Sequence, residues 1–164
     1  MKIHPHPVAA RHISALGPVL LAATSQGLAG LWFEGQRHHP DTAGWPLDAS
    51  HPVLVAAAAQ LDEYLAGQRT TFDLPLDLQH GTVFQQSVWR ALLAIPHGAS
   101  TSYAELGQRI GAPGAARAVG AAVGRNPLSV VVPCHRVLGA GGALTGYAGG
   151  LDRKTALLRL EGAL

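Results

Sequence analysis

Two regions near the N-terminus show the apolar pattern expected of β-strands. Apolar runs at 19–24 and 28–33 are separated by three residues that end in Gly27, which predicts a β-hairpin. Apolar and polar residues then alternate over 72–78, which predicts a half-buried edge strand in which Pro75 is tolerated. The first half of the chain is therefore expected to contain a small sheet.

Helical spacing of apolar residues marks two longer segments. Apolar residues recur with a helical period between residues 51 and 66, and again over 84–95. The second of these helices is expected to end before Pro96, which cannot continue it. The stretch 37–50 contains glycine, proline and histidine without a period, so we expect a loop there.

A helix-turn-helix is predicted in the second half of the chain. Ser102 is followed three residues later by Glu105, a capping-box pattern that begins a short helix. The glycine-containing segment 111–114 ends it, and a second helix follows over about 115–124. Arg117 stands alone among small residues on the outer face of that helix, which allows close approach to a partner such as a DNA groove. A solvated arginine on an alanine-rich helix is the alternative.

The candidate chemistry lies just after this motif. The β-branched run 128–132 predicts a buried strand, which Pro133 would end immediately before Cys134. A thiol needs a base or a positive field to become a nucleophilic thiolate, and the adjacent His135 and Arg136 offer one of each. The alternative is that Cys134 is a small buried hydrophobic residue.

The composition is that of a folded domain. Of the 164 residues, 48% are hydrophobic and 13% charged, which argues against wholesale disorder and against a coiled coil. No apolar run approaches the roughly 18–20 residues that cross a bilayer, and the N-terminus lacks the apolar stretch of a signal peptide. We therefore expect a cytoplasmic protein without membrane contact.

Metal and disulfide chemistry are not expected. Cys134 is the only cysteine, which rules out an internal disulfide and any zinc site that needs two or more thiolates. Seven of the nine histidines lie in the first eighty residues, at no recurring ligand spacing. We expect neither a metal nor another cofactor.

Charge divides the chain near Gln79-His80-Gly81. Residues 1–80 hold four basic and seven acidic side chains, a net −3, whereas residues 81–164 hold eight basic and three acidic, a net +5. We expect a structural domain over 1–80 and a second domain over 81–164 that carries the chemistry. The basic C-terminal half indicates a polyanionic partner.

The segment Pro133-Cys134-His135-Arg136-Val137 resembles the active-site signature of the O6-alkylguanine-DNA alkyltransferases. The similarity extends to Arg117-Ala118-Val119-Gly120, Asn126-Pro127, the loop from Gly146 to Leu151 and the segment from Lys154 to Gly162. These ordered blocks cover residues 82–162, while 28–33 resembles the variable first domain of the family more loosely. The resemblance implies an α+β fold, with a small N-terminal sheet-plus-helix domain and a mostly helical, winged helix-turn-helix-like C-terminal domain.

The resemblance also implies a reaction. Cys134 would attack the alkyl carbon on the O6 oxygen of guanine in double-stranded DNA, with O4-alkylthymine as a further candidate substrate. The thioether product is stable, so each molecule would react once. His135 would act through a water as the base, and Glu161 would orient and polarise its imidazole.

Further roles follow from the resemblance only. It makes Asn126 a bridge that holds the active-site segment near His135, and Tyr103 a hydrogen-bond donor to the guanine ring; a turn-forming asparagine and a packing tyrosine are the alternatives. It assigns Arg117 the place in the duplex that the extruded nucleotide vacates, reached from the minor groove, although a helix-turn-helix alone predicts the major groove. It places the remaining substrate and DNA contacts at Ala115, Ala116, Arg136, Val137, Tyr147, Ala148 and Gly149.

Three other functions compete with this one. A non-catalytic binder of alkylated DNA is the main alternative, and the presence of Cys134 argues against it. A transcriptional regulator would need an effector domain, and a cysteine hydrolase would turn over many times. We expect a monomer and leave cooperative assembly on DNA open. Some family members carry serine where this chain has Ala148, so only its backbone amide can contact the O6 position.

Overall fold

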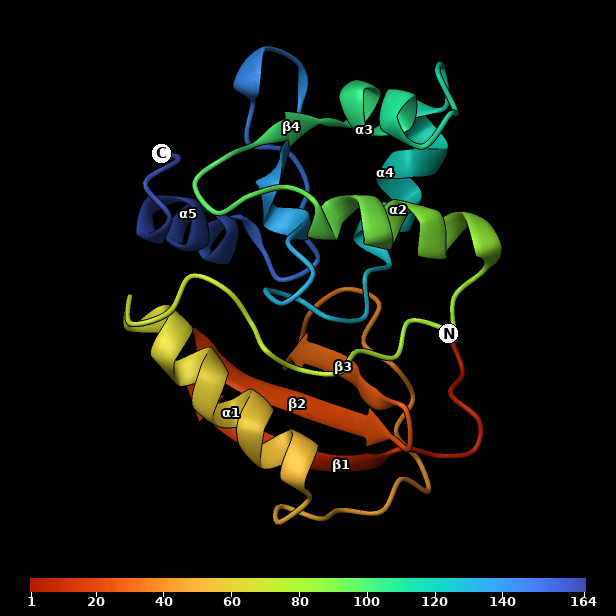
Figure 1. Ribbon diagram of the computed structural model, residues 1–164, viewed down its shortest axis with the longest axis vertical. Helices are drawn as coiled ribbons and strands as arrows, with labels where there is room; N and C mark the ends of the chain where they lie inside the picture. Colours follow the sequence, from red (N-terminus) through yellow and green to blue (C-terminus); the bar gives the residue numbers. More distant parts are fainter.

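The computed structural model describes residues 1–164, and its N-terminal half (residues 1–80) is a sheet covered by one helix. An antiparallel sheet of order β1-β2-β3 is formed by β1 (Val8–Ser14), β2 (Gly17–Thr24) and β3 (Gly27–Phe33). Helix α1 (Pro52–Leu65) packs against it (Figure 1). The expected hairpin and helix are confirmed, although Gly27 belongs to β3 rather than to the turn. Strand β1 was not anticipated, because its alanines have little strand preference and Arg11-His12 interrupts its apolar pattern.

The expected edge strand over 72–78 is wrong. This segment forms one isolated parallel bridge, between Leu76 and Leu28 of β3, with the Leu28 amide donating to the Pro75 carbonyl at 2.8 Å. The approach is close, because a Cβ on Gly27 would lie 2.5 Å from that carbonyl oxygen. Pro75 has no N–H to extend the ladder, so one rung forms and no strand follows.

The C-terminal half (residues 81–164) is mostly helical, as expected. Its helices are α2 (Val83–Leu93), α3 (Tyr103–Arg109), α4 (Ala116–Gly124) and α5 (Leu151–Leu160). A short parallel pair, β4 (Thr101–Ser102) with β5 (Val137–Leu138), joins the start of α3 to the chain that follows Cys134. None of these helices, nor α1, combines the length and the apolar character needed to cross a membrane.

The predicted cap of α3 is half formed. Ser102 accepts a hydrogen bond from the Glu105 amide at 3.1 Å, as in a capping box. The Glu105 carboxylate, however, accepts from the Thr101 hydroxyl at 2.8 Å instead of returning to the Ser102 amide. The cap still fixes the start of α3 at Tyr103, one of the predicted site residues.

The run 128–132 is buried but is not the expected strand. It makes one bridge, from Leu128 to Leu31 of β3, and then turns, with the Val132 amide donating to the Leu128 carbonyl at 2.9 Å and Val130 at a φ of 72°. The reason is Asn126, whose side chain bonds the Leu128 amide and carbonyl and the Val132 carbonyl. These bonds replace the ladder partners that a strand would need.

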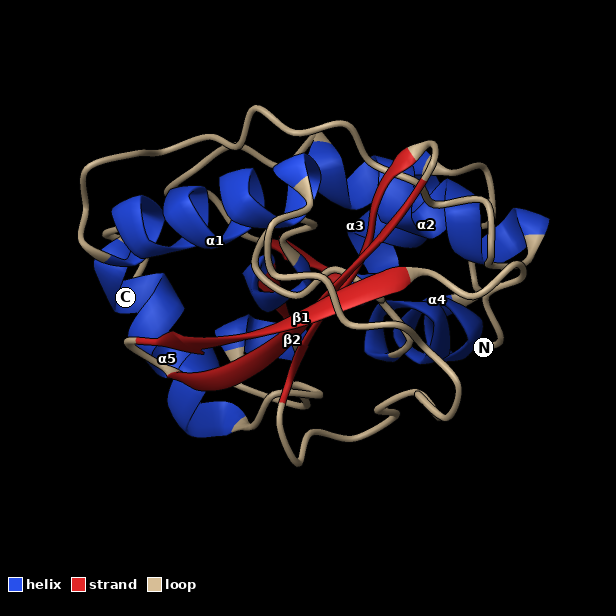
Figure 2. Cartoon of the chain, turned by 90° about the horizontal axis from the view of Figure 1, so that it is seen from below, coloured by secondary structure: helices blue, strands red, loops and turns tan.

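The two halves share one core. Figure 2 views the molecule from below Figure 1, with the sheet nearest the reader, and shows α1 running beside the strands. The largest apolar cluster joins Leu31 and Leu61 of the N-terminal half to Val88 and Leu157 of the C-terminal half. Arg153 of α5 adds a polar link to the N-terminal half, because its Nε donates to the Leu16 carbonyl at 2.8 Å.

Candidate active site

Cys134 lines a cavity of about 220 Å³ between the two halves of the chain. It begins a short 3-10 helix, η1 (Cys134–Arg136), directly after the buried turn. The other lining residues are Arg37, His38, Tyr103, Gly120, Ala121, Val123, Gly124, Gly146, Tyr147 and Ala148. No carboxylate is among them, so the wall that faces Cys134 is neutral or basic.

Burial keeps Cys134 protonated in this state. Desolvation raises the pKa of its thiol, while the Asn126 side chain and the Lys154 charge oppose that rise without overcoming it. The sulfur therefore needs a base at the moment of reaction.

His135 and Glu161 form a buried pair directly behind Cys134. The His135 Nε2 lies 2.7 Å from the Glu161 Oε2, and both side chains have no exposed surface. Burial lowers the pKa of His135, and although burial alone would raise the pKa of Glu161, hydrogen bonds from His135 and Arg136 hold it far below its ordinary value. An ionised Glu161 requires the proton on Nε2, which leaves the lone pair on Nδ1. Nδ1 is buried without a protein partner, so it is the atom available to accept a proton.

Arg136 does not reach the cavity, which corrects its expected place among the DNA contacts. Its Nε and Nη2 donate to the two oxygens of Glu161 at 2.8 and 3.0 Å. Nη1 donates to the Ile95 carbonyl at 2.6 Å, and Nη2 also donates to the Tyr64 oxygen at 3.2 Å. The guanidinium is buried, so its role is to hold Glu161 rather than to meet a phosphate.

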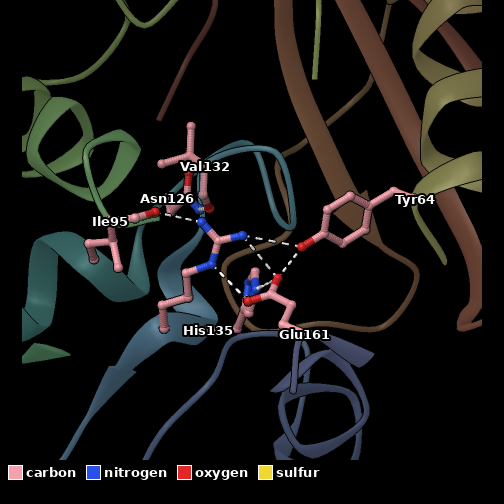
Figure 3. Close-up of polar contacts among 7 residues, drawn as sticks. Tyr64, Ile95, Asn126, Val132, His135 and Glu161 are labelled. Carbon is pink, nitrogen blue, oxygen red and sulfur yellow. Dashed lines mark hydrogen bonds and ion pairs between the residues drawn. The ribbon is translucent and has the colours of Figure 1, made fainter. Parts of the chain in front are cut away.

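Tyr64 is a site residue that the sequence did not single out. It comes from α1, and its hydroxyl donates a hydrogen bond to Glu161, as Figure 3 shows. In the sequence it is one of several apolar positions on the inner face of α1, and nothing distinguishes it from a packing residue. The loop after β3 was missed as well: its Arg37 and His38 line the cavity, and the Arg37 amide donates to the Ala148 carbonyl at 3.1 Å.

Asn126 is buried beneath Cys134. Its Nδ2 donates to the Val132 carbonyl at 2.8 Å and its Oδ1 accepts from the Leu128 amide at 3.0 Å. No hydrogen bond joins it to His135; its side chain supports the backbone of the active-site turn instead. The bonds to Leu128 form the turn, and the bond to Val132 holds the chain just before Cys134. Asn126 therefore combines the turn-forming role with that of a bridge to the active-site segment.

Lys154 joins the chain after η1 to the loop that carries Tyr147. Its ammonium is fully buried and donates to the carbonyls of Val137, Thr145 and Gly146 at 2.6, 2.8 and 3.2 Å. The predicted contact Val137 is thus joined to the loop that carries Tyr147. Gly149 is needed in that loop, because a Cβ there would lie 2.6 Å from the Tyr147 ring.

The residues predicted at the start of α4 lie outside the cavity, and other residues of the helix line it. Ala115, Ala116 and Arg117 lie at its exposed or half-exposed N-terminal end and do not line the cavity, and Arg117 has no ion-pair partner. Small residues one to two turns further on, Gly120, Ala121 and Gly124, form part of the cavity wall. Helix α4 therefore carries the exposed, unpaired Arg117 at its N-terminal end and lines the Cys134 cavity with its later turns.

Comparisons with known proteins agree along most of the chain. Two family models match, "6-O-methylguanine DNA methyltransferase, ribonuclease-like domain" at residues 13–78 and "6-O-methylguanine DNA methyltransferase, DNA binding domain" at residues 83–163. A methylated-DNA–protein-cysteine methyltransferase of Mycobacterium tuberculosis is 51% identical over 148 residues, which cover 90% of this chain and 88% of the relative. One of Methanosarcina acetivorans is 46% identical over 151 residues, covering 92% and 95%.

Solved structures agree with the sequence matches. The crystal structure of the Mycobacterium tuberculosis O6-methylguanine methyltransferase superposes with a TM-score of 0.85 at 48% identity, covering 96% of this chain and 93% of that one. The crystal structure of the same organism's protein in complex with DNA gives a TM-score of 0.84 at 47% identity, with the same coverage.

Proposed function

We propose, since the chain belongs to the 6-O-methylguanine DNA methyltransferase family, that it repairs O6-alkylguanine in duplex DNA by moving the alkyl group to Cys134. The observation that carries this proposal is the placement of Cys134 at the cavity, with the His135–Glu161 pair behind it. The function rests on the residues of the C-terminal half, which we propose as the DNA-binding and alkyl-transfer domain, supported by the N-terminal half.

The reaction is a displacement at the alkyl carbon. His135 Nδ1, acting through a water, takes the thiol proton as the sulfur forms a bond to that carbon. The bond from the carbon to the guanine O6 breaks, and its electron pair stays on the guanine. Tyr103 donates a hydrogen bond to the guanine ring and stabilises this developing anion. The thioether has no leaving group that water can displace under these conditions, so one molecule repairs one lesion.

The target nucleotide must leave the base stack to reach Cys134. An alkylated base is extruded at a cost of a few kcal/mol, and the cavity receives it. Arg117, at the free end of α4, takes the vacated position from the minor-groove side, and the neighbouring Ala115 and Ala116 allow close contact. The loop with Tyr147, Ala148 and Gly149 closes over the base. The Cys134 carbonyl accepts from its exocyclic amine, and so does the Val137 carbonyl with the lone pair that Lys154 does not use.

Intact-mass spectrometry after incubation with a duplex that contains one O6-methylguanine tests the proposal. We expect a gain of one methylene mass on Cys134 that saturates at one equivalent. The matched variant Cys134→Ala should bind the same duplex and gain no mass. Binding without a mass gain in the wild-type protein would favour a non-catalytic binder of alkylated DNA, and release of product beyond one equivalent would favour a hydrolase. A second duplex with O4-methylthymine measures whether the cavity also accepts a pyrimidine.

A further inference from the structure

We propose that Tyr64 is a positioning residue of the alkyl-transfer centre, which holds the carboxylate of Glu161 against His135 and thereby brings the N-terminal half into the activation of Cys134. This inference rests on the proposed function above. Tyr64 is the one side chain of residues 1–80 that hydrogen-bonds to the His135–Glu161 pair.

The ring of Tyr64 is fixed in place. The residue is 1% exposed and lies in the last turn of α1. Its ring stacks on Phe72 with centroids 4.9 Å apart, and the edge of His97 packs against it with centroids 6.0 Å apart. The hydroxyl emerges from this packing toward Glu161, as the close-up shows (Figure 3). The position of the oxygen is therefore set by packing, and only its proton can turn.

The hydrogen-bond donors around Tyr64 determine where that proton points. The Arg136 guanidinium can only donate, so at 3.2 Å its Nη2 donates to the Tyr64 oxygen. The Tyr64 proton is then committed to Glu161. The Oε2 of Glu161 accepts from Tyr64, from His135 Nε2 at 2.7 Å and from Arg136 Nη2 at 3.0 Å. Removing the hydroxyl takes one donor from Glu161 and one acceptor from Arg136.

The strength of Glu161 as a hydrogen-bond acceptor affects the pKa of His135. The charged or titratable groups that face His135 are Glu161, Arg136, Lys154 and Cys134, while Glu161 faces His135, Arg136 and Tyr64. Each donor to Glu161 makes its carboxylate a weaker acceptor for the His135 Nε2 proton. With Tyr64 in place the imidazole stays neutral to lower pH, which is the state in which Nδ1 can take the thiol proton.

The test is the pH dependence of the rate of methyl transfer in Tyr64→Phe, measured in single turnover from pH 5 to 9. This substitution keeps the ring and removes only the hydroxyl. We expect the acid limb of the profile to move to higher pH by about one unit, which on that limb is about a tenfold slower reaction. The affinity for the duplex should not change. Phe84→Leu is the control: it removes a partly buried aromatic ring of α2 from the same core, leaves Tyr64 and its neighbours Phe72 and His97 in place, and should leave the acid limb where it is.

The outcomes separate the two proposals. An acid limb at the wild-type position in Tyr64→Phe overturns the role of Tyr64, even if the rate falls uniformly. No transfer by the wild-type protein in the same series overturns the proposed function itself. If Tyr64→Phe does not fold, proton NMR of the wild-type protein decides. The Tyr64 hydroxyl and His135 Nε2 protons share one acceptor oxygen, so a cross-relaxation peak between them is expected, and its absence overturns the inference.

Discussion

At the scale of single residues, the site depends on the buried carboxylate of Glu161, whose charge needs neighbouring donors to be stable. Glu161 is 6% exposed and ionised, a placement that costs several kcal/mol unless charge and hydrogen bonds compensate. Its donors are Tyr64 of α1 and the adjacent His135 and Arg136 of η1, so two distant parts of the chain supply them. Apolar residues of the same volume would stabilise such a site at least as well, so the arrangement is better explained by the proton that His135 must accept.

Replacing Glu161 tests this at the same scale. Glu161→Gln keeps the shape and removes the charge, so Arg136 is left buried without its counter-ion and unfolding should become easier by about 3–5 kcal/mol. Thermal unfolding of the variant and the wild type at pH 7 measures this difference. A change within about 0.5 kcal/mol, as for an ordinary surface substitution, would contradict the buried-pair assignment.

The same variant has a predicted pH signature. The pKa of Glu161 is depressed in the folded protein, so the stability it contributes is complete above its unfolded value of about 4.3 and is lost as the pH falls below that. The pKa of His135 is also depressed, so stability falls as the pH drops below the unfolded value of about 6.5. The wild-type melting temperature should therefore decline below about pH 6.5 and steepen below about 4.3. Glu161→Gln should show a smaller second step, to which Asp77, whose pKa is also lowered, still contributes. Parallel curves would show that Glu161 does not titrate with folding.

At the scale of elements, helix α4 separates two tasks along its length. Its free N-terminal end carries Arg117, and its later turns form the cavity wall. An exposed arginine without a partner contributes little to stability, so the proposed contact with DNA can be tested by removing the side chain without unfolding the protein.

Arg117→Ala should therefore affect duplex repair and little else. In the proposed mechanism the side chain stands in for a stacked base, and base stacking is worth about 1–3 kcal/mol, so we expect repair in duplex DNA to slow by about 5- to 150-fold. Reaction with free O6-benzylguanine, which needs no extrusion, should remain close to wild type. Arg159→Ala, an exposed arginine on α5, removes the same charge and should change neither reaction. Equal losses with both substrates in Arg117→Ala would argue against a role in extrusion.

The elements could be predicted from the sequence where their signals are local. The hairpin, α1 to α4 and the Ser102 cap follow from periodicity and capping within a few residues of each other. The turn at 128–132 could not, because its β-branched residues favour a strand and a side chain two residues earlier, Asn126, overrides them. The role of Cys134 came from a resemblance, and the contact of Tyr64 with Glu161, 97 residues away, has no local signal at all.

At the scale of the whole molecule, the N-terminal half completes the mouth of the cavity. The buried Gln36 fixes the loop after β3, because its Oε1 accepts from the Phe33 amide at 2.8 Å. The following Arg37 and His38 face the cavity, and the pKa of His38 is lowered by partial burial and by the charges of Arg125 and Arg37. The N-terminal half is acidic overall, but at the cavity it presents the positive charge of Arg37, beside the basic C-terminal half.

This placement predicts that Arg37 meets a backbone phosphate when the nucleotide is extruded. Arg37 is exposed and pairs with no carboxylate, so Arg37→Ala should leave stability within about 0.5 kcal/mol of wild type. It should weaken binding to duplex DNA and lower the slope of log affinity against log salt by about 0.9, the loss of one phosphate contact. Arg69→Ala, which removes a charge already paired with Glu63, is the control and should keep the slope. Titrations of both variants at several salt concentrations measure the difference, and an unchanged slope in Arg37→Ala would place the arginine outside the DNA interface. Free O6-benzylguanine carries no phosphate, so its reaction should slow less than duplex repair in Arg37→Ala, where a side chain of the cavity is lost, and should keep the wild-type rate in Arg69→Ala.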